Sequence, residues 1–213
     1  MDGAYIDSVI DPAKESRPLE TNVVAMDAHA QATLRHIRSS MDAATLVVTP
    51  GSAGIAIGLV GVVTALLAAG PWRAHWLLIW IAAAPLAGLI GATIMARQQR
   101  IQGRTLFGPS GRRFVLCLAP ALLAGAVLTA VNVQDSNLRV VPGTWLLLYG
   151  SAVMAASAAT IPLVSWFGGL FVLFGIAALL SPASAHNLIL GASFGGLHLL
   201  FGAYLVGRGS RDG

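Results

Sequence analysis

Long apolar runs alternate with short polar segments along most of the chain. Six runs lie between clusters of Pro and Gly, at residues 52–70, 74–96, 114–132, 144–160, 162–180 and 188–206. None of the six contains Asp, Glu, Lys or Arg. Each has about the 20 residues that an α-helix needs to cross ~30 Å of hydrocarbon. The pattern predicts an all-α integral membrane protein, with a six-helix transmembrane bundle over residues 50–207 and a short tail over residues 208–213.

The composition agrees with a membrane protein. Of the 213 residues 56% are hydrophobic and 10% are charged, whereas soluble domains have about 25% charged residues. The chain therefore has too few charges to cover a core in water. One Cys also excludes a disulfide scaffold.

The positions of the basic residues predict the orientation. All 13 Lys and Arg except Arg73 and Arg139 fall on one side of the predicted spans. The positive-inside rule then predicts that both termini lie in the cytoplasm. Trp72, Trp76 and Trp145 are expected in an aromatic belt at the outer interface.

The segment before the first span has two parts. Residues 1–23 are acidic and poor in apolar side chains, which is typical of disorder. Residues 24–49 place Leu34, Ile37 and Met41 on one helical face, with arginines elsewhere around the circumference. This cytoplasmic amphipathic helix could lie in the interface, dock on a protein partner or pack under the bundle.

Side chains for catalysis are scarce in the predicted spans. They lack carboxylates, and the chain has no HExxH or GxSxG motif. His75 and His186 both map to the outer boundary and could meet at a metal, but imidazole is also common at a wet interface. We therefore expect no enzyme activity, no catalytic residue, no metal site and no cofactor.

His198 is the one ionisable side chain deep in a predicted span, so it is a candidate intramembrane polar site. It could line a pathway or bind a haem. A haem or metal would need a second ligand at similar depth. We expect instead a neutral histidine that shares a hydrogen bond with a serine of another helix.

A nine-residue segment occurs twice, as residues 167–175 and 194–202, with identity at seven positions. Consecutive spans are antiparallel, so the two copies are expected to pack closely against each other through their small residues. The candidate helix-packing residues are Gly168, Gly169, Gly175, Gly195, Gly196 and Gly202. Gly54/Gly58 and Gly191/Gly195 have GxxxG spacing, which suits contact within the chain or a homo-oligomer interface.

The loop between the second and third spans is rich in arginine. Its basic residues are Arg97, Arg100, Arg104, Arg112 and Arg113. Guanidinium groups bind phosphate well, so these residues are candidates to set the topology and to contact anionic lipid headgroups. The sequence pI near 10.0 then needs no nucleic acid partner.

Four stretches carry a resemblance to known sequences: residues 41–61 with Val48-Thr49-Pro50-Gly51, residues 108–114, residues 142–150, and Phe194-Gly195-Gly196-Leu197-His198. Together they resemble an uncharacterised family of bacterial, acidobacterial-type, six-helix integral membrane proteins of unknown function. The resemblance implies an inner-membrane location and supplies no functional residues.

Two functions remain open on the sequence. The first is a regulatory, sensory or scaffold membrane component with a cytoplasmic protein partner. The alternative is a small channel or carrier for a neutral or apolar solute, with Pro85 and Pro120 bending the second and third spans.

Overall fold

The computed structural model describes residues 31, 33–34, 51–101, 109–157 and 162–209. The chain divides into two units, Met1–Ala44 and Thr45–Gly213. In the first unit Gln31, Thr33 and Leu34 are helical and exposed. The predicted disordered segment and the rest of the predicted amphipathic helix lie outside the described residues.

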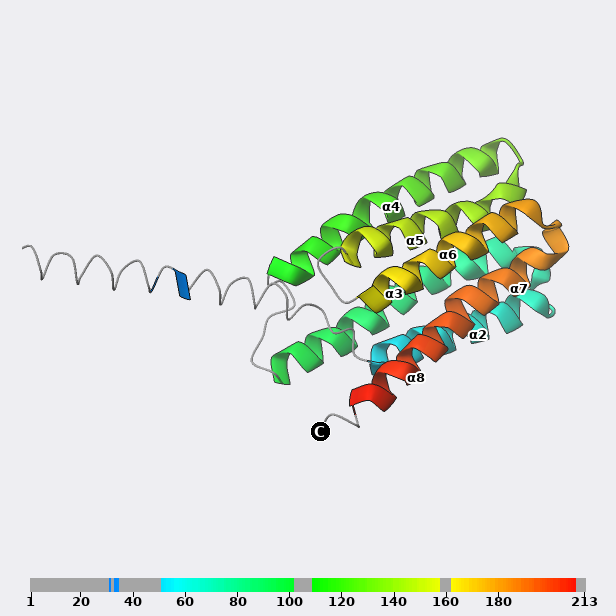
Figure 1. Cartoon of the computed structure of the whole chain (residues 1–213). Coiled ribbons are helices and arrows are strands. Elements are labelled where there is room, and N and C mark those ends of the chain that lie inside the picture. The colour runs from blue at the N-terminus through cyan, green and yellow to red at the C-terminus, as the bar shows by residue number, and fades with distance from the viewer. Residues whose placement is uncertain (1–30, 32, 35–50, 102–108, 158–161, 210–213) are drawn as a thin grey trace, which may run out of the picture. The chain divides into compact units, whose positions relative to one another are not determined.

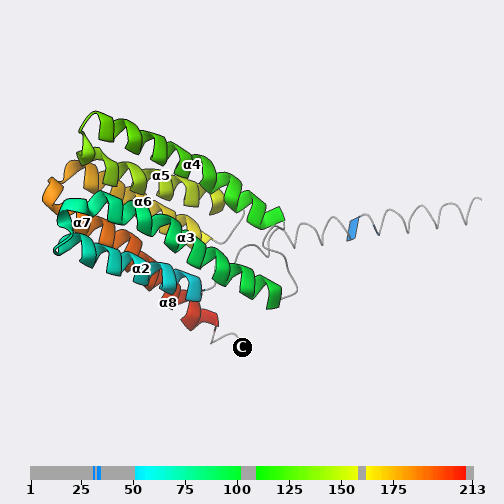
Figure 2. The same cartoon turned by 180° about the vertical axis from the view of Figure 1, so that it is seen from behind.

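The described part of the second unit is entirely helical apart from its turns (Figures 1 and 2). Its α-helices are α2 (Gly51–Ala69), α3 (Trp76–Ile101), α4 (Pro109–Gln134), α5 (Val141–Ser157), α6 (Pro162–Leu180), α7 (His186–Leu190) and α8 (His198–Gly209). A π-helical segment, Gly191–Leu197, joins α7 to α8 in one continuous rod. Within these residues six helical segments are long and apolar enough to cross a membrane, which confirms the predicted six helices of spanning length and composition.

The six spans form three helical hairpins with similar turns. A short 3-10 helix comes directly before the second helix of each hairpin, at Arg73–His75, Leu138–Val140 and Ala183–Ala185. Pro85 and Pro120 lie inside α3 and α4, and both helices continue through them.

The helices pack as two groups of three. In the first group α5 lies between α4 and α6, and in the second group α2 lies between α3 and the rod that ends in α8 (Figures 1 and 2). We call them the α4–α5–α6 group and the α2–α3–α8 group. The hairpin between α6 and α7 joins the two groups.

Glycines bring the backbones of α5 and α6 into direct contact. A Cβ atom added at Gly150 would lie 2.6 Å from the carbonyl oxygen of Gly168, and one added at Gly143 would lie 2.9 Å from that of Gly175. Real Cβ atoms do not approach backbone so closely, so these positions admit glycine alone without a shift of the helices.

The same arrangement joins α8 to α2. A Cβ atom added at Gly202 would lie 2.6 Å from the carbonyl oxygen of Gly51, and one added at Gly195 would lie 3.0 Å from the backbone nitrogen of Val62. Gly58 in turn approaches the backbone of Gly195 and Leu199. The glycines with GxxxG spacing therefore make contacts within the chain.

The two copies of the repeat do not pack glycine against glycine, contrary to expectation. The copy in α6 places Gly168 and Gly175 against α5, and the second copy places Gly195 and Gly202 against α2. Each copy thus packs on a different helix. The second glycine of each pair, Gly169 or Gly196, would have nothing within 4 Å of an added Cβ atom, so neither approaches another helix closely.

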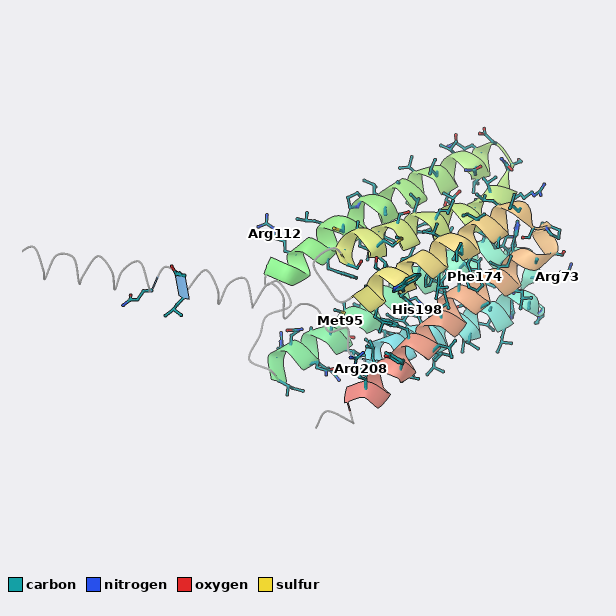
Figure 3. All side chains as sticks on the ribbon, viewed as in Figure 1. Arg73, Met95, Arg112, Phe174, His198 and Arg208 are labelled. Atoms are coloured by element: carbon teal, nitrogen blue, oxygen red, sulfur yellow. The ribbon has the colours of Figure 1, made fainter. Side chains whose placement is uncertain are left out.

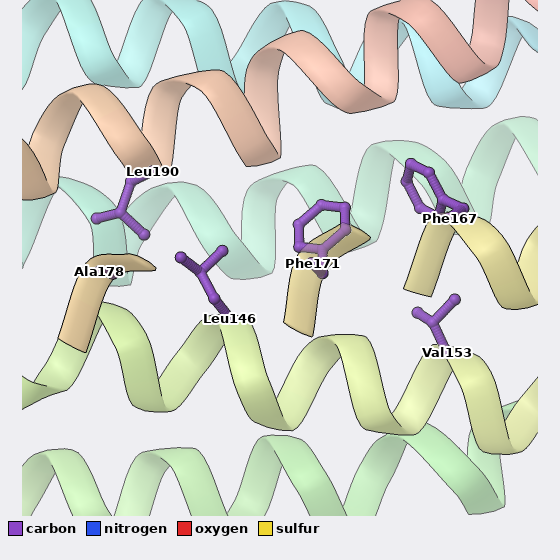
Figure 4. Packing of buried hydrophobic residues seen from close by; sticks show 6 residues of the cluster. All are labelled: Leu146, Val153, Phe167, Phe171, Ala178 and Leu190. Atoms are coloured by element: carbon purple, nitrogen blue, oxygen red, sulfur yellow. The ribbon is translucent and has the colours of Figure 1, made fainter. Parts of the chain in front are cut away.

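The buried apolar cluster lies between the two groups. Its core consists of Leu146, Val153, Phe167, Phe171, Ala178 and Leu190 (Figure 4). Partly buried rings from α3 and from the rod of α7 and α8 pack against it, among them Trp80, Phe194 and Phe201. Side chains from both groups therefore fill the centre of the bundle.

The outward faces of α3 and α4 are strongly apolar and exposed. Leu78 and Leu89 on α3 are each 63% exposed, and Leu123 on α4 is 67% exposed. An apolar surface of this extent is typical of contact with lipid chains rather than with water. Trp72 is also exposed, whereas Trp145 is half-buried and packs against Gly125 of α4.

Candidate functional site: a histidine among aromatic rings

His198 is the first residue of α8 and is 5% exposed. Its Nε2 atom shares a hydrogen bond with the hydroxyl of Tyr149 on α5, at 3.0 Å. The bond therefore joins the α2–α3–α8 group to the α4–α5–α6 group. Figure 3 shows His198 inside the bundle, far from Arg73 at one end.

Phenylalanine rings from both groups enclose this pair. The His198 ring lies edge-on to Phe167 at 5.1 Å and to Phe171 at 5.4 Å, measured between centroids. It is nearly parallel to Phe194 at 6.3 Å. The Tyr149 ring also contacts Phe171 and Phe194, at 4.8 and 5.3 Å. We call these rings, together with Phe201, the aromatic seam, because they line the boundary between the two groups.

The other ring nitrogen of His198 is less well satisfied. Nδ1 is buried without a hydrogen-bond partner of normal geometry in the part of the chain that the structure describes. The ring does interact with the backbone carbonyls of Phe194 and Ser193 on its own rod. Carbonyls are acceptors, so this side of the ring favours the tautomer with hydrogen on Nδ1, and Tyr149 then donates to Nε2.

The predicted serine partner of His198 is replaced by Tyr149. Ser193, the buried serine nearest in sequence, uses its hydroxyl to donate to the carbonyls of Ile189 and Leu190. A serine in a helix can satisfy itself in this way without a partner on another helix. The signal for Tyr149 was its place in an apolar span, where a buried tyrosine hydroxyl needs a partner.

A second polar contact crosses helices at Asn187, which the sequence analysis missed. The Trp80 indole donates to the Asn187 side-chain oxygen at 3.0 Å. The Asn187 amide donates to the carbonyl oxygen of Ala65 at 2.9 Å. Asn187 thereby links α7 to both α3 and α2. Its sequence signal was an amide side chain at the start of an apolar run, where an unpaired amide is costly.

His75 and His186 have different surroundings. His75 is exposed, whereas His186 is 5% exposed and its Nε2 is buried without a hydrogen-bond partner among the described residues. No group of three or more His, Cys, Asp or Glu side chains is placed to hold a metal ion within the same described ranges.

The candidate arginines lie at the ends of α3 and α4. Arg97 and Arg100 are exposed near the end of α3, and Arg112 is exposed in the first turn of α4. Arg113 also lies in α4, and Arg104 is outside the described residues. Figure 3 places Arg112 and Arg208 toward one end of the bundle and Arg73 at the other.

Comparison with protein-family models, curated proteins and solved structures finds no match to this chain.

Proposed function

We propose that the chain is a multi-pass protein of the bacterial inner membrane with both termini in the cytoplasm. Support comes from the six apolar spans and from the separation of basic residues between the two ends of the bundle. Arg97 and Arg100 lie at the end of α3 that is far from Arg73. Arg112 and Arg208 also lie toward the end of the bundle opposite to Arg73 (Figure 3). The positive-inside rule assigns the more basic end to the cytoplasm.

The basic end is suited to anionic lipid headgroups. Arg97, Arg100 and Arg112 are exposed, and a guanidinium group can donate two hydrogen bonds to one phosphate. Their position at helix ends next to long apolar surfaces supports a depth near the headgroups in the proposed membrane arrangement. We therefore propose that the lipid bilayer is a partner of the protein, and we propose no nucleic acid partner.

Within that membrane we propose a regulatory, sensory or scaffold role without catalysis. The observation that carries this proposal is the filled centre of the bundle. His198 was the polar residue that could line a solute pathway. It forms a hydrogen bond with Tyr149 and is enclosed by phenylalanine rings. A carrier needs a binding site near the midplane, and here that position holds packed side chains.

The proposed role requires a contact with another protein, and the cytoplasmic segment is the part we assign to it. Residues 24–49 combine apolar and basic side chains, which suits a protein surface as well as a membrane surface. A second copy of the chain is a further partner that we retain. The resemblance to bacterial six-helix membrane proteins fits this location.

Deletion of residues 1–49 tests the role directly. We expect the shortened protein to insert into the membrane and to lose proteins that copurify with the full chain from a mild detergent extract. A second variant is the full chain with Leu34 and Ile37 replaced by Asp, which removes the apolar face, keeps the length and should lose the same proteins. Unchanged copurifying proteins and an unchanged phenotype in both variants would contradict the proposal.

Flux measurements test the alternative function, which is a small channel or carrier for a neutral or apolar solute. Vesicles that contain the purified protein should pass glycerol and other small neutral solutes no faster than empty vesicles of the same lipids. Faster flux that is lost on substitution of the residues around His198 would favour a channel or carrier.

A further inference from the structure

The two helix groups are held together internally by close backbone contact. At Gly150 in the first group and Gly202 in the second, an added Cβ atom would meet backbone atoms of the neighbouring helix at 2.6 Å. Backbones in van der Waals contact leave little room for rearrangement, because rotamer changes cannot relieve a clash with main chain. Each pair, α5 with α6 and α2 with α8, should move as one body.

The contact between the groups has a different character. It consists mainly of aromatic rings at a range of angles, from 27° between Phe167 and Phe201 to 86° between Phe167 and His198. Phenyl rings can slide and change rotamer without breaking a hydrogen bond. Among the side-chain hydrogen bonds of the described residues, the bond between Tyr149 and His198 is the one that crosses this seam at its centre.

Two further features indicate that the side of the seam formed by the α2–α3–α8 group is adaptable. The seam residue Phe194 lies in the π-helical segment Gly191–Leu197, and π-helical turns inside α-helices occur frequently at functional sites. The Nδ1 atom of His198 is buried without a partner of normal geometry among the described residues. A buried donor whose contacts with the carbonyls of Phe194 and Ser193 lack normal hydrogen-bond geometry is only weakly paired, which reduces the advantage of the closed seam over an open one.

We propose that the bundle is a two-state device in which the α4–α5–α6 group and the α2–α3–α8 group separate along the aromatic seam, with the hydrogen bond between Tyr149 and His198 as the latch of the closed state. Opening exposes the seam and allows water to form a hydrogen bond of normal geometry with Nδ1. The π-helical segment absorbs the local change, because an extra residue in a helical turn can shift along the helix. This inference goes beyond the proposed function and does not depend on the identity of any partner.

Thiol accessibility measures the opening. Val153 belongs to the buried cluster that fills the seam and is 3% exposed, so Val153→Cys is a seam reporter of similar size. Ala53 on α2 is 0% exposed and is not part of that cluster, so Ala53→Cys is the matched control reporter. Both are made with Cys117→Ala, because Cys117 is the native cysteine, and both are treated with N-ethylmaleimide in lipid vesicles.

Removal of the latch by Tyr149→Phe should raise the reaction rate of the Val153→Cys reporter about tenfold, which corresponds to the loss of one buried hydrogen bond. The rate of the Ala53→Cys reporter should not change. Trp145→Phe is the matched control for the latch, because it removes a hydrogen bond to Thr129 within one group. It should leave the rates of both reporters unchanged.

Three outcomes would overturn the inference. They are no acceleration in the Tyr149→Phe variant, equal acceleration of both reporters, and equal acceleration by Trp145→Phe. Should the cysteine variants fail to fold, hydrogen exchange on the Tyr149→Phe protein replaces them. The rate of backbone hydrogen exchange should then rise in residues 191–201 and stay unchanged in residues 51–61. A uniform rise, or no rise, would contradict the proposed opening along the aromatic seam.

Discussion

Phe171 and His198 occupy the same position in the two copies of the nine-residue repeat, and their rings lie 5.4 Å apart across the seam. The repeat therefore brings its two copies face to face through aromatic rings, while Gly168 and Gly175 pack on α5 and Gly195 and Gly202 pack on α2. At this central position one copy has an apolar ring and the other a polar one. That difference allows the hydrogen bond from Tyr149.

The glycines of the repeat should differ in their tolerance of a methyl group. Gly168→Ala places a Cβ atom 2.7 Å from the Met154 side chain and 2.8 Å from the carbonyl oxygen of Gly150. Overpacking of this kind costs about 1–3 kcal/mol. We expect a loss of that size in the free energy of unfolding, measured by SDS titration in mixed micelles.

Its neighbour Gly169 is the matched control. An added Cβ atom there has nothing within 4 Å, so Gly169→Ala should change the free energy of unfolding by less than about 0.5 kcal/mol. Equal losses in the two variants would show that the helix pairing described above is wrong.

The second copy should behave in the same way on a different helix. Gly195→Ala meets the Val62 side chain at 2.8 Å and its backbone nitrogen at 3.0 Å, whereas Gly196→Ala meets nothing within 4 Å. We expect destabilisation of about 1–3 kcal/mol for the first variant and little for the second. Rescue of Gly195→Ala by Val62→Ala would locate the clash, and failure of rescue would argue against contact at this point.

A double-mutant cycle measures the bond between Tyr149 and His198. His198→Phe makes the two repeat copies alike at this position and leaves the buried Tyr149 hydroxyl without its partner. Tyr149→Phe removes the hydroxyl, so the double variant has neither polar group. We expect a coupling free energy of about 0.5–2 kcal/mol. Strict additivity in the unfolding measurements would mean that the two side chains do not interact.

Asn187 should be more sensitive to substitution than Asn132. Asn187 bonds to two other helices through Trp80 and Ala65, whereas the Asn132 amide donates to the Leu128 carbonyl of its own helix. Asn187→Leu should lower the free energy of unfolding by about 1–3 kcal/mol, because the Trp80 indole is left without its acceptor. Asn132→Leu should be nearly neutral. A larger loss for Asn132→Leu would contradict the network.

The spans could be predicted from the sequence because lipid excludes charge and because helix length in a bilayer is fixed. The helix against which each glycine packs could not be predicted from the sequence. A small residue indicates that some backbone comes close, and Gly168 and Gly195 carry the same local sequence yet contact α5 and α2.

The candidate site was predictable in part. The depth of His198 identified it as a buried polar residue, but its hydrogen-bond partner depended on which helices face each other. The π-helical segment was also missed, although Gly191, Gly195 and Gly196 lie within it. Local sequence specifies that such a segment can deform, and tertiary packing decides whether it does.

The account depends most on six spans with the arginine-rich end in the cytoplasm, and cysteine labelling tests this directly. In the Cys117→Ala background, Asn137→Cys lies in an exposed turn near Arg139 and Gln98→Cys lies at the exposed end of α3. A membrane-impermeant maleimide applied to intact spheroplasts should label the Asn137→Cys variant. It should label the Gln98→Cys variant only after the spheroplasts are lysed. Labelling of Gln98→Cys before lysis, with protection of Asn137→Cys, would contradict the orientation and the cytoplasmic role built on it.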